Sequence, residues 1–440
     1  MKRITLIISL LINLSLQAQE FSKQKMDSLF NLIEAENKGM GSIAISHDGE
    51  MVYEQSMGMA QVENQIKATA TTRYHIGSIS KTFTATLIMQ LIEEGKLTLH
   101  TPLSDFFREI PNADSIHIEH LLRHQSGLFN FTSAEDYQTW MEQEVSRKKF
   151  LQIIRNYPIE FGAGEKTAYS NTNYVLLTFI AEDISHESYA SLLEERIIKP
   201  CGLTHTQFGT KKTQEEAYSY TFTKTWQAST QTHPSVTLGA GGILSTPADL
   251  NKFLTCLFEG KLVSEASLEK MKNLENGVGM GLFRFPFHDK YAYGHTGGVD
   301  GFLSIATYFP KEKVALAYLS NGVVMSRNDI LIGALSIYFG REYQLPEFTE
   351  PLDLPVKTLK QYVGTYSSPG LPLSLKIFIK EEQLFGQGTN QPSFPLQAYE
   401  EDKFRFEAAQ LTIDFHPEED KLILFQGGGK FELMRKQESD

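Results

Sequence analysis

The spacing of hydrophobic and polar residues changes several times along the chain. Residues 22–36 carry hydrophobic side chains at helical spacing, and residues 42–59 alternate on both sides of a central turn. This pattern predicts a helix followed by a β-hairpin. After Ser78, hydrophobic residues recur every three to four positions until Gly95, so Ser78 is expected at the start of a buried helix.

The middle of the chain has a different pattern from the segments around it. Between residues 100 and 260 the spacing is mainly helical, with turns rich in Gly and Asn. Strands are then predicted at residues 291–295, 301–308 and 314–319, and a closing helix at 329–338. Helices at both ends, strands split between them and a helical insert predict a two-lobed α/β domain.

The last part of the chain is separated by a segment rich in proline and acidic residues, 345–355, which is typical of a linker. Short alternating runs follow it, and regular short strands with turn signals favour a small antiparallel β-barrel over residues 356–440. The runs are Leu373–Ile379, Gln383–Gly386, Lys403–Phe406, Leu411–Phe415, Leu422–Phe425 and Phe431–Met434.

The N-terminus has the pattern of a secretory signal peptide. Lys2 and Arg3 precede an apolar run at residues 4–16, and the run ends in Gln17 and Ala18. A run of about thirteen residues is too short for the roughly 20 that span a bilayer, so a retained membrane anchor is the weaker alternative. We therefore expect residues 1–18 to be removed and the mature protein to be periplasmic or secreted, without a transmembrane anchor.

Composition and charge exclude several classes of function. The 440 residues are 41% hydrophobic and 21% charged, which is typical of a folded soluble protein. Loss of two positive charges with the signal peptide takes the formal charge from −12 to −14, which disfavours nucleic acid as a partner. Cys201 and Cys256 form no metal-binding motif, so neither a metal nor a cofactor is expected. We expect two buried free thiols rather than a disulfide between them.

A candidate nucleophile lies at the start of the helix predicted after Ser78. Ser78 and Lys81 form an S-x-x-K tetrad, which on a helix places both side chains on one face, one turn apart. Gly77 allows close approach of the backbone, and the buried helix would hold the serine rigidly. The tetrad alone is weak, because it also occurs at Ser22/Lys25, Ser146/Lys149 and Ser267/Lys270.

Two further motifs supply what attack by a serine requires. Tyr169-Ser170-Asn171 lies in a segment rich in Gly and polar residues, and His295-Thr296-Gly297-Gly298 is expected to end a strand. A serine nucleophile needs a base, a cation that stabilises the base, and donors that face the developing oxyanion. The three motifs together can provide these groups, although a lone Tyr or His is usually a packing residue.

With these motifs in place, the sequence resembles a known family. The segment His75–Ala85 is similar to the nucleophile segment of class C β-lactamases, D-alanyl-D-alanine peptidases, D-aminopeptidases and related esterases. Tyr169–Asn171 resembles the Y-x-N motif of that family, and His295–Gly297 resembles its K/H-T-G motif. The three motifs stand in the order and at the spacing that the family shows.

The resemblance extends over roughly residues 25–342. Leu121–Leu128 and Gly239–Pro247 are similar to framework segments of the family, and the tail from Tyr362-Val-Gly-Thr-Tyr366 resembles a lipocalin-like barrel that some members carry. The resemblance implies an antiparallel sheet flanked by helices plus a helical lobe, of the β-lactamase/transpeptidase type, over residues 19–344. The barrel would follow the linker.

The resemblance also implies roles for the motif residues in acyl transfer. Ser78 would attack a carbonyl while Lys81 stabilises its alkoxide, and Tyr169, drawn toward phenolate by Lys81 and His295, would act as base and then as acid. The amides of Ser78 and Gly298 would form the oxyanion hole. Substrate-binding positions would be Asn171, which would also orient Lys81, and Thr296, Gly297 and Gly298.

One position departs from the β-lactamase pattern, because those enzymes usually carry Lys where this chain has His295. A neutral or half-protonated imidazole holds a carboxylate less firmly, and its titration is expected to give activity a limb near pH 6 to 7. We therefore favour a peptidase on cell-wall or D-amino-acid peptides over an esterase or a β-lactamase. The expected partners are a small peptide, ester or β-lactam and peptidoglycan. A non-catalytic penicillin-binding or sensor protein is the alternative of another class.

Overall fold

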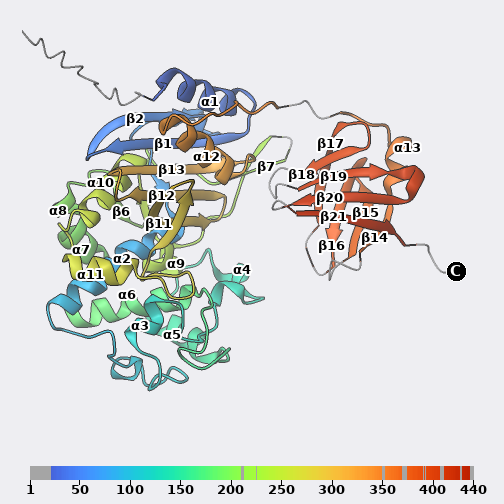
Figure 1. Ribbon diagram of the computed structural model, residues 1–440. Helices are drawn as coiled ribbons and strands as arrows, with labels where there is room; N and C mark the ends of the chain where they lie inside the picture. The colour runs from blue at the N-terminus through green and yellow to red at the C-terminus, as the bar shows by residue number, and fades with distance from the viewer. Residues whose placement is uncertain are drawn as a thin grey trace, which may run out of the picture.

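In the computed structural model, residues before the barrel form a six-stranded antiparallel sheet with the strand order β10-β11-β12-β13-β1-β2 (Figure 1). The structure describes residues 21–209, 213–223, 225–348, 352–368, 374–389, 391, 393–406, 411–426 and 429–436. The sheet strands are β1 (Gly39–His47), β2 (Glu50–Met57), β10 (Phe283–Phe287), β11 (Lys290–Val299), β12 (Phe302–Phe309) and β13 (Val314–Val323). The predicted signal peptide, residues 1–18, lies outside the described residues.

Strand β11 is longer than the sequence pattern indicated. Its pairing with β12 continues with Gly297 opposite Ser304 and Gly298 opposite Leu303, so the expected strand end at His295 is wrong. The two glycines have no side chains that could show the alternation of a strand, which explains the early end of the pattern. The His295 motif therefore lies inside a strand.

Two helices cover one face of the sheet. α1 (Lys23–Ala35) and α12 (Arg327–Tyr338) correspond to the helices predicted at residues 22–36 and 329–338. Leu29 and Phe30 of α1 are buried in one hydrophobic cluster with Ile330 of α12 and the apolar side chains of the sheet. The two ends of the predicted α/β domain therefore pack together.

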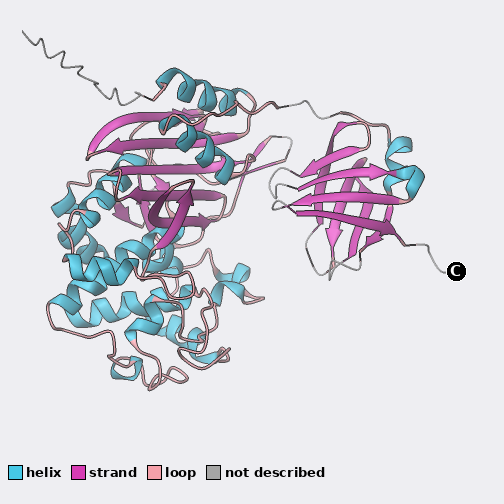
Figure 2. Cartoon of the chain, in the orientation of Figure 1, coloured by secondary structure: helices cyan, strands magenta, loops and turns pink. Residues whose placement is uncertain are grey.

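The predicted helical insert covers the other face (Figure 2). α10 (Pro247–Phe258) packs directly against β1, β12 and β13. Next to it, α2 (Ser80–Glu93), α6 (Asn171–Ser185) and α9 (Pro234–Gly241) contact one another and form the centre of the helical lobe. Helix α2 is the buried helix expected after Ser78.

Shorter elements complete the lobe. Its other helices are α3 (Ile118–Leu122), α4 (Tyr137–Trp140), α5 (Arg147–Asn156), α7 (Tyr189–Leu193), α8 (Lys199–Cys201) and α11 (Glu265–Lys272). The short strands are β3 (Met59–Gln61), β4 (Ile66–Lys67), β5 (Tyr74–His75), β6 (Gln207–Phe208), β7 (Tyr220–Phe222), β8 (Trp226–Ala228) and β9 (Ile243–Ser245). Within the described residues, no helix combines the length and apolar character needed to cross a membrane.

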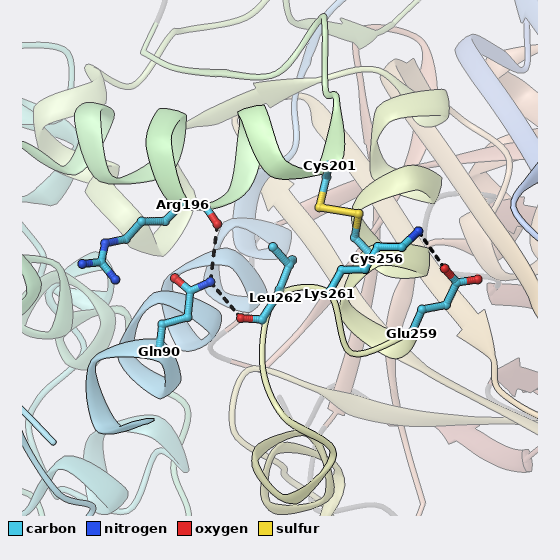
Figure 3. Close-up of a disulfide and its surroundings, with 7 residues drawn as sticks. All are labelled: Gln90, Arg196, Cys201, Cys256, Glu259, Lys261 and Leu262. Atoms are coloured by element: carbon cyan, nitrogen blue, oxygen red, sulfur yellow. Dashed lines mark hydrogen bonds and ion pairs between the residues drawn. A yellow bond between two sulfur atoms is a disulfide. The ribbon is translucent and has the colours of Figure 1, made fainter. Parts of the chain in front are cut away.

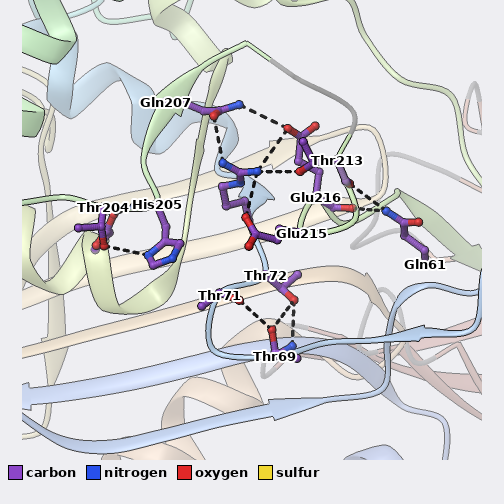
Figure 4. Close-up of polar contacts among 12 residues, drawn as sticks. Gln61, Thr69, Thr71, Thr72, Thr204, His205, Gln207, Thr213, Glu215 and Glu216 are labelled. Carbon is purple, nitrogen blue, oxygen red and sulfur yellow. Dashed lines mark hydrogen bonds and ion pairs between the residues drawn. The ribbon is translucent and has the colours of Figure 1, made fainter.

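Polar contacts fix the segment before Ser78 to residues 207–216 (Figure 4). The Arg73 guanidinium donates to Gln207 Oε1 at 3.1 Å and to Thr213 Oγ1 at 2.7 Å, and it lies 3.8 Å from the Glu216 carboxylate. Gln61 Nε2 donates to the Glu216 backbone oxygen at 2.8 Å. Residues before β5 are thus fixed to a segment about 140 residues later in the chain.

A disulfide joins Cys201 at the end of α8 to Cys256 on α10 (Figure 3). The expectation of two free thiols is therefore wrong. Helix packing brings the two Cα atoms to 6.0 Å, inside the range that a disulfide bridges, and nothing in the sequence indicated that these helices meet. In the same region, Gln90 Nε2 of α2 donates to the Leu262 oxygen at 2.9 Å.

The tail forms a closed antiparallel β-barrel of eight strands, which confirms the predicted barrel. All six predicted runs fall on its strands, although Leu373 lies outside the described residues; the first and fourth strands were not among those runs. The strands are β14 (Gly364–Ser367), β15 (Ser374–Lys380), β16 (Gln383–Gly388), β17 (Ser393–Glu400), β18 (Lys403–Phe406), β19 (Leu411–His416), β20 (Lys421–Gln426) and β21 (Gly429–Arg435), preceded by α13 (Val356–Leu359).

The described ends of the linker each contact a different hydrophobic core. Leu345 packs against the cluster between α1, α12 and the sheet. At the other end, Leu354 packs against the barrel core, and the Leu352 amide donates to the Ala398 oxygen of β17 at 2.8 Å. The boundaries at residues 344/345 and 355/356 stay a prediction.

Candidate active site

Ser78 lies in the 3-10 turn η1 (Gly77–Ile79), immediately before α2. The preceding Gly77 has a φ of +53°, and a Cβ atom on it would lie 2.8 Å from the Gly298 nitrogen. Only glycine fits both this conformation and this approach. The backbone of the nucleophile turn therefore lies directly against the end of β11, which brings two of the three predicted motifs together.

Lys81 is buried on the first turn of α2, with no exposed surface. Its Nζ lies 2.9 Å from Ser78 Oγ, 2.8 Å from Asn171 Oδ1 and 2.6 Å from the Ala240 oxygen. No carboxylate of the described residues forms an ion pair with it, and burial lowers the pKa of Lys81 well below its usual value. The neutral amine is thus favoured beside Ser78.

Tyr169 extends over the same site from the segment before α6. Its ring centre lies 5.0 Å from Lys81 Nζ, and its hydroxyl is in hydrogen-bond contact with Ser78. Although 41% of the residue is exposed, burial of the phenol raises the pKa of Tyr169 well above 10, and the contact with Ser78 only partly offsets this. The expected phenolate is therefore wrong: no cation compensates the desolvation, and Tyr169 remains a neutral phenol.

The ring of Tyr169 is stacked on His124, a residue that sequence reasoning did not single out. The ring centres are 4.2 Å apart, and His124 Nδ1 accepts the Ser170 amide at 3.1 Å. His124 is buried, and burial is the main cause that lowers its pKa well below 6.5. This histidine positions the tyrosine; its place in the framework segment Leu121–Leu128 was the only signal for it.

Asn171 is the first residue of α6, and its amide is oriented by a loop that the sequence analysis also missed. Its Nδ2 donates to Asn130 Oδ1 at 3.2 Å and to Thr132 Oγ1 at 3.1 Å. The Asn171 backbone amide donates to the same Asn130 oxygen at 2.9 Å. These contacts leave Oδ1 of Asn171 facing Lys81, as the sequence predicted for this pair.

His295 is 3% exposed and lies on β11 beside Tyr169, with ring centres 6.3 Å apart. Its Nδ1 lies 2.5 Å from the Thr296 oxygen, so the neutral ring carries its proton there, while Nε2 has no partner among the described residues. Burial is the main cause that lowers the pKa of His295 to about 3. The expected titration near pH 6 to 7 is therefore wrong for this group.

The rest of the His295 motif places β11 against the nucleophile segment. A Cβ atom on Gly297 would lie 2.0 Å from the Ile76 oxygen, so glycine is required there. Ser304 Oγ, on the neighbouring strand β12, donates to the same oxygen at 2.8 Å. Thr296 is partly exposed and Gly298 is exposed, so this stretch of β11 is accessible beside Ser78.

The other S-x-x-K tetrads have structural explanations. Ser22 Oγ accepts the Lys25 amide at 3.2 Å, and Ser146 Oγ accepts the Lys149 amide at 3.3 Å, so both serines cap helices. Ser267 lies inside α11, where its own amide donates to Ser264. Of the four serines in these tetrads, Ser78 is the one whose Oγ contacts the side-chain nitrogen of its lysine.

A cavity of about 370 Å³ opens in front of Ser78. Asn171 and Gly298 line it beside the nucleophile, α4 and the loop at residues 229–232 form two of its walls, and Asp300 lies at the end of β11. Among the described residues, no group of three His, Cys, Asp or Glu side chains could hold a metal ion. The site therefore offers the Ser78 hydroxyl and backbone amides at one cavity, with an amine and a phenol in contact with Ser78.

Comparison with known proteins agrees with this arrangement. The chain is 25% identical to a penicillin-binding protein of Bacillus subtilis over 94% of this chain and 98% of that protein. It is 27% identical to the teichoic acid D-alanine hydrolase of Staphylococcus aureus, over 68% of this chain and 72% of that protein. The solved D-amino acid amidase of Ochrobactrum anthropi is 25% identical, with a TM-score of 0.65 over 71% of this chain and 98% of the amidase.

Residues 30–335 match the protein family described as Beta-lactamase. The match covers more than half of the chain and contains every motif residue from Ser78 to Gly298. The homologous hydrolases and the geometry around Ser78 agree with this assignment. The chain is a serine hydrolase that belongs to the beta-lactamase family.

Proposed function

We propose that the protein hydrolyses amide bonds of D-amino acids, in small amides or in cell-wall peptides, through an acyl-enzyme on Ser78. The observation that carries the proposal is the contact between Ser78 Oγ and the buried Lys81 Nζ at 2.9 Å, with the pKa of Lys81 lowered. The names of the amidase and the D-alanine hydrolase that the chain resembles support the substrate class.

In the proposed acylation step, neutral Lys81 takes the proton of Ser78 while Oγ forms a bond to the substrate carbonyl carbon. Asn171 Oδ1 and the Ala240 oxygen accept the two N–H groups that the amine retains, which leaves its lone pair for the serine proton. The backbone amides of Ser78 and Gly298 would stabilise the oxyanion. Lys81 therefore takes the role of general base that the sequence analysis gave to Tyr169.

Collapse of the tetrahedral intermediate breaks the C–N bond, and the leaving amine receives a proton from Lys81 through the Tyr169 hydroxyl. The phenol accepts one proton as it donates another, so Tyr169 needs no lasting negative charge. Water then attacks the acyl-enzyme carbonyl carbon and gives a proton to neutral Lys81. Collapse of this second intermediate breaks the C–Oγ bond, and Lys81 returns the proton to Ser78 Oγ. The products are a free acid and the regenerated Ser78 hydroxyl.

Esterase activity at the same site is the second candidate, since Ser78 would attack an ester by the same steps. Turnover of β-lactams is less favoured, because His295 is neutral above a pH of about 3 and does not supply the cation that would hold a carboxylate. Cell-wall peptides remain within the proposed substrate class.

We also propose that the protein acts in the periplasm or outside the cell. The disulfide between Cys201 and Cys256 supports an oxidising compartment, because such bonds persist there and are rare in the cytosol. A comparison of the N-terminus of the exported protein with the encoded one tests the proposed cleavage after residue 18.

The test of the proposed function is a substrate profile with a labelling control. We expect faster hydrolysis of D-alanine p-nitroanilide than of its L-enantiomer or a chromogenic cephalosporin, and fluorophosphonate label on Ser78 by peptide mapping. Ser78→Ala should abolish both signals, whereas Ser146→Ala, at a helix-capping S-x-x-K, should retain them. Label on another serine, or a cephalosporin as the best substrate, would overturn the proposal.

A further inference from the structure

The cavity in front of Ser78 has one charged group in its wall. Of the described residues that line the cavity, Asp300 is the only Asp, Glu, Lys, Arg or His. It directly follows β11 and is two residues beyond Gly298, which contacts the nucleophile turn. A substrate bound for attack by Ser78 therefore meets a negative charge.

Asp300 is held rigidly. Its carboxylate oxygens accept the Thr232 amide at 3.0 Å and the Thr232 hydroxyl at 2.7 Å, so the loop at residues 229–232 fixes their direction. The backbone of Asp300 has a φ of +52°, a conformation that Asp and Asn adopt more readily than most residues. The carboxylate is therefore prepared for a ligand before one binds.

The same carboxylate has no cationic partner among the described residues. Burial raises the pKa of Asp300, the two bonds from Thr232 lower it, and the neighbouring Glu142 raises it further. A partly buried carboxylate without a countercharge is unfavourable, and each oxygen can accept another hydrogen bond. A positively charged amino group of a substrate would supply both the missing countercharge and the hydrogen-bond donors.

The spacing limits where that charged group can lie. Gly298 opposes Gly77, so the carbonyl under attack must lie near Gly298. Asp300 is two residues further along the chain, and two residues span at most about 7 Å. An ammonium group close to the scissile carbonyl lies within reach of the Asp300 side chain, whereas a carboxylate in that place would be repelled.

We propose that Asp300 binds a free ammonium group next to the scissile carbonyl, so that the enzyme selects substrates with an unblocked amino group. This inference rests on the proposed D-amino-acid hydrolase function and narrows it, because cell-wall peptides whose nitrogen next to the scissile carbonyl is acylated would be excluded. A D-aminoacyl amide or ester meets the requirement. An N-acylated peptide lacks the positive charge, and a β-lactam adds a negative one.

The test compares two substrates that differ at the amino group, which is a free ammonium in one and an uncharged acetylated nitrogen in the other. The ratio of kcat/KM for D-alanine p-nitroanilide to that for its N-acetyl derivative measures the preference at a pH where the amino group is protonated. We expect wild type to favour the free amine at least about 10-fold, and Asp300→Asn to lower this ratio about 10- to 100-fold. Asn fits the φ of +52° and is similar in size.

Glu142→Gln is the matched control. Glu142 affects the pKa of Asp300 but does not line the cavity, so its loss should leave the ratio within about threefold of wild type. Equal losses in both variants would show a general effect of charge and would overturn direct binding by Asp300. Wild-type enzyme that does not distinguish the two substrates would overturn it without any variant.

A neutral ester, p-nitrophenyl acetate, separates this inference from the proposed function. Turnover of the ester and fluorophosphonate label on Ser78 report whether the nucleophile is intact in each variant. If wild type labels at Ser78 but accepts the N-acetyl substrate equally well, the Asp300 inference fails and the hydrolase remains. If no acyl donor reacts at Ser78, the proposed function itself fails.

Discussion

The barrel and the β-lactamase-like part bury different kinds of side chains. In the described residues from 352 onward, the buried side chains are apolar or aromatic, and the hydroxyls of Tyr362 and Tyr366 have hydrogen-bond partners. The β-lactamase-like part also buries Lys81, His124 and His295, all within the site around Ser78. Both regions are well packed, but among the described residues only the β-lactamase-like part buries Lys, Arg, His, Asp or Glu side chains.

Some of these buried groups are structural, such as Arg123 and Asp249, which have ion-pair or hydrogen-bond partners. Lys81 and His295 instead lie beside Ser78 without a countercharge in the described part of the chain. A buried ionisable group opposes folding unless its surroundings compensate for the lost water. The barrel avoids this cost with a core of Leu, Ile, Phe and Tyr. Around Ser78 the cost is accepted, because burial shifts the pKa of Lys81 and of His295 toward their neutral forms.

Removal of the buried Lys81 amine should produce the largest loss of activity. Lys81→Met keeps a side chain of similar length but removes the base, so kcat/KM for p-nitrophenyl acetate should fall by about 10² to 10⁴. Lys149→Met is the control, because Lys149 belongs to an S-x-x-K tetrad but is exposed on α5. Near-normal turnover by Lys81→Met would identify another group as the base.

Tyr169→Phe should cost less, about 10- to 100-fold in kcat/KM for an amide substrate, because the neutral phenol only passes a proton. The ring would still stack on His124, whose ring centre is 4.2 Å away, so the fold should be unaffected. The loss should be smaller for an ester with a good leaving group. A loss as large as that of Lys81→Met with both substrates would restore Tyr169 as the base.

Removal of the disulfide should change stability rather than catalysis. Cys201 and Cys256 are 55 residues apart in the sequence, and loss of such a cross-link typically lowers the free energy of unfolding by about 2 to 4 kcal/mol. The double serine variant should therefore unfold at lower urea concentration with nearly unchanged kcat/KM. Because both cysteines lie outside the barrel, a change in barrel unfolding alone would contradict this assignment.

Truncation after residue 344 should have a small effect on small substrates. The cavity is lined by residues up to Asp300, so removal of the barrel should leave kcat/KM for p-nitrophenyl acetate within about threefold. The measurement is a melting curve together with ester turnover for the truncated and complete chains. A truncated chain that cannot be obtained in folded form would show that the barrel is part of the catalytic core.

The smallest expected change is in the pH profile of a His295 variant. Attack requires neutral Lys81. We therefore expect kcat/KM to increase as the pH rises through the lowered pKa of this lysine, and to be low at pH values below that pKa. His295, with a pKa of about 3, is already neutral across this range. Replacement of His295 by Asn should therefore leave the position of the acid limb unchanged between pH 4 and 9, and its disappearance would assign the limb to His295.

The sequence predicted most of the architecture, because periodic patterns record which face of an element is buried. It located both helices that cover the outer face of the sheet, the hairpin, the helix after Ser78 and the barrel. The strand containing the His295 motif was ended too early, since Gly297 and Gly298 carry no side chains to show alternation. Patterns of this kind do not report backbone pairing.

The sequence predicted the three motifs of the site but not the residues that surround them. The three motifs do meet around one cavity, but Asn130, His124 and Asp300 came from loops and turns without periodicity. The protonation states were also wrong, because the pKa values of Tyr169 and His295 depend on burial that local sequence does not show. The disulfide was missed for a related reason, since its cysteines meet only through helix packing.

Because Gly77 and Gly298 are in close contact, added side-chain atoms would damage this site more than the removal of side-chain atoms would. The N–H groups of the main chain are present in every residue except proline, so no deletion of side-chain atoms removes them. An added methyl group has unequal effects: on Gly77 it would meet the Gly298 nitrogen at 2.8 Å, whereas on Gly298 it would meet only the end of Leu303 at 3.6 Å. In a population under mutation, position 77 would tolerate no replacement while position 298 remains open to variation.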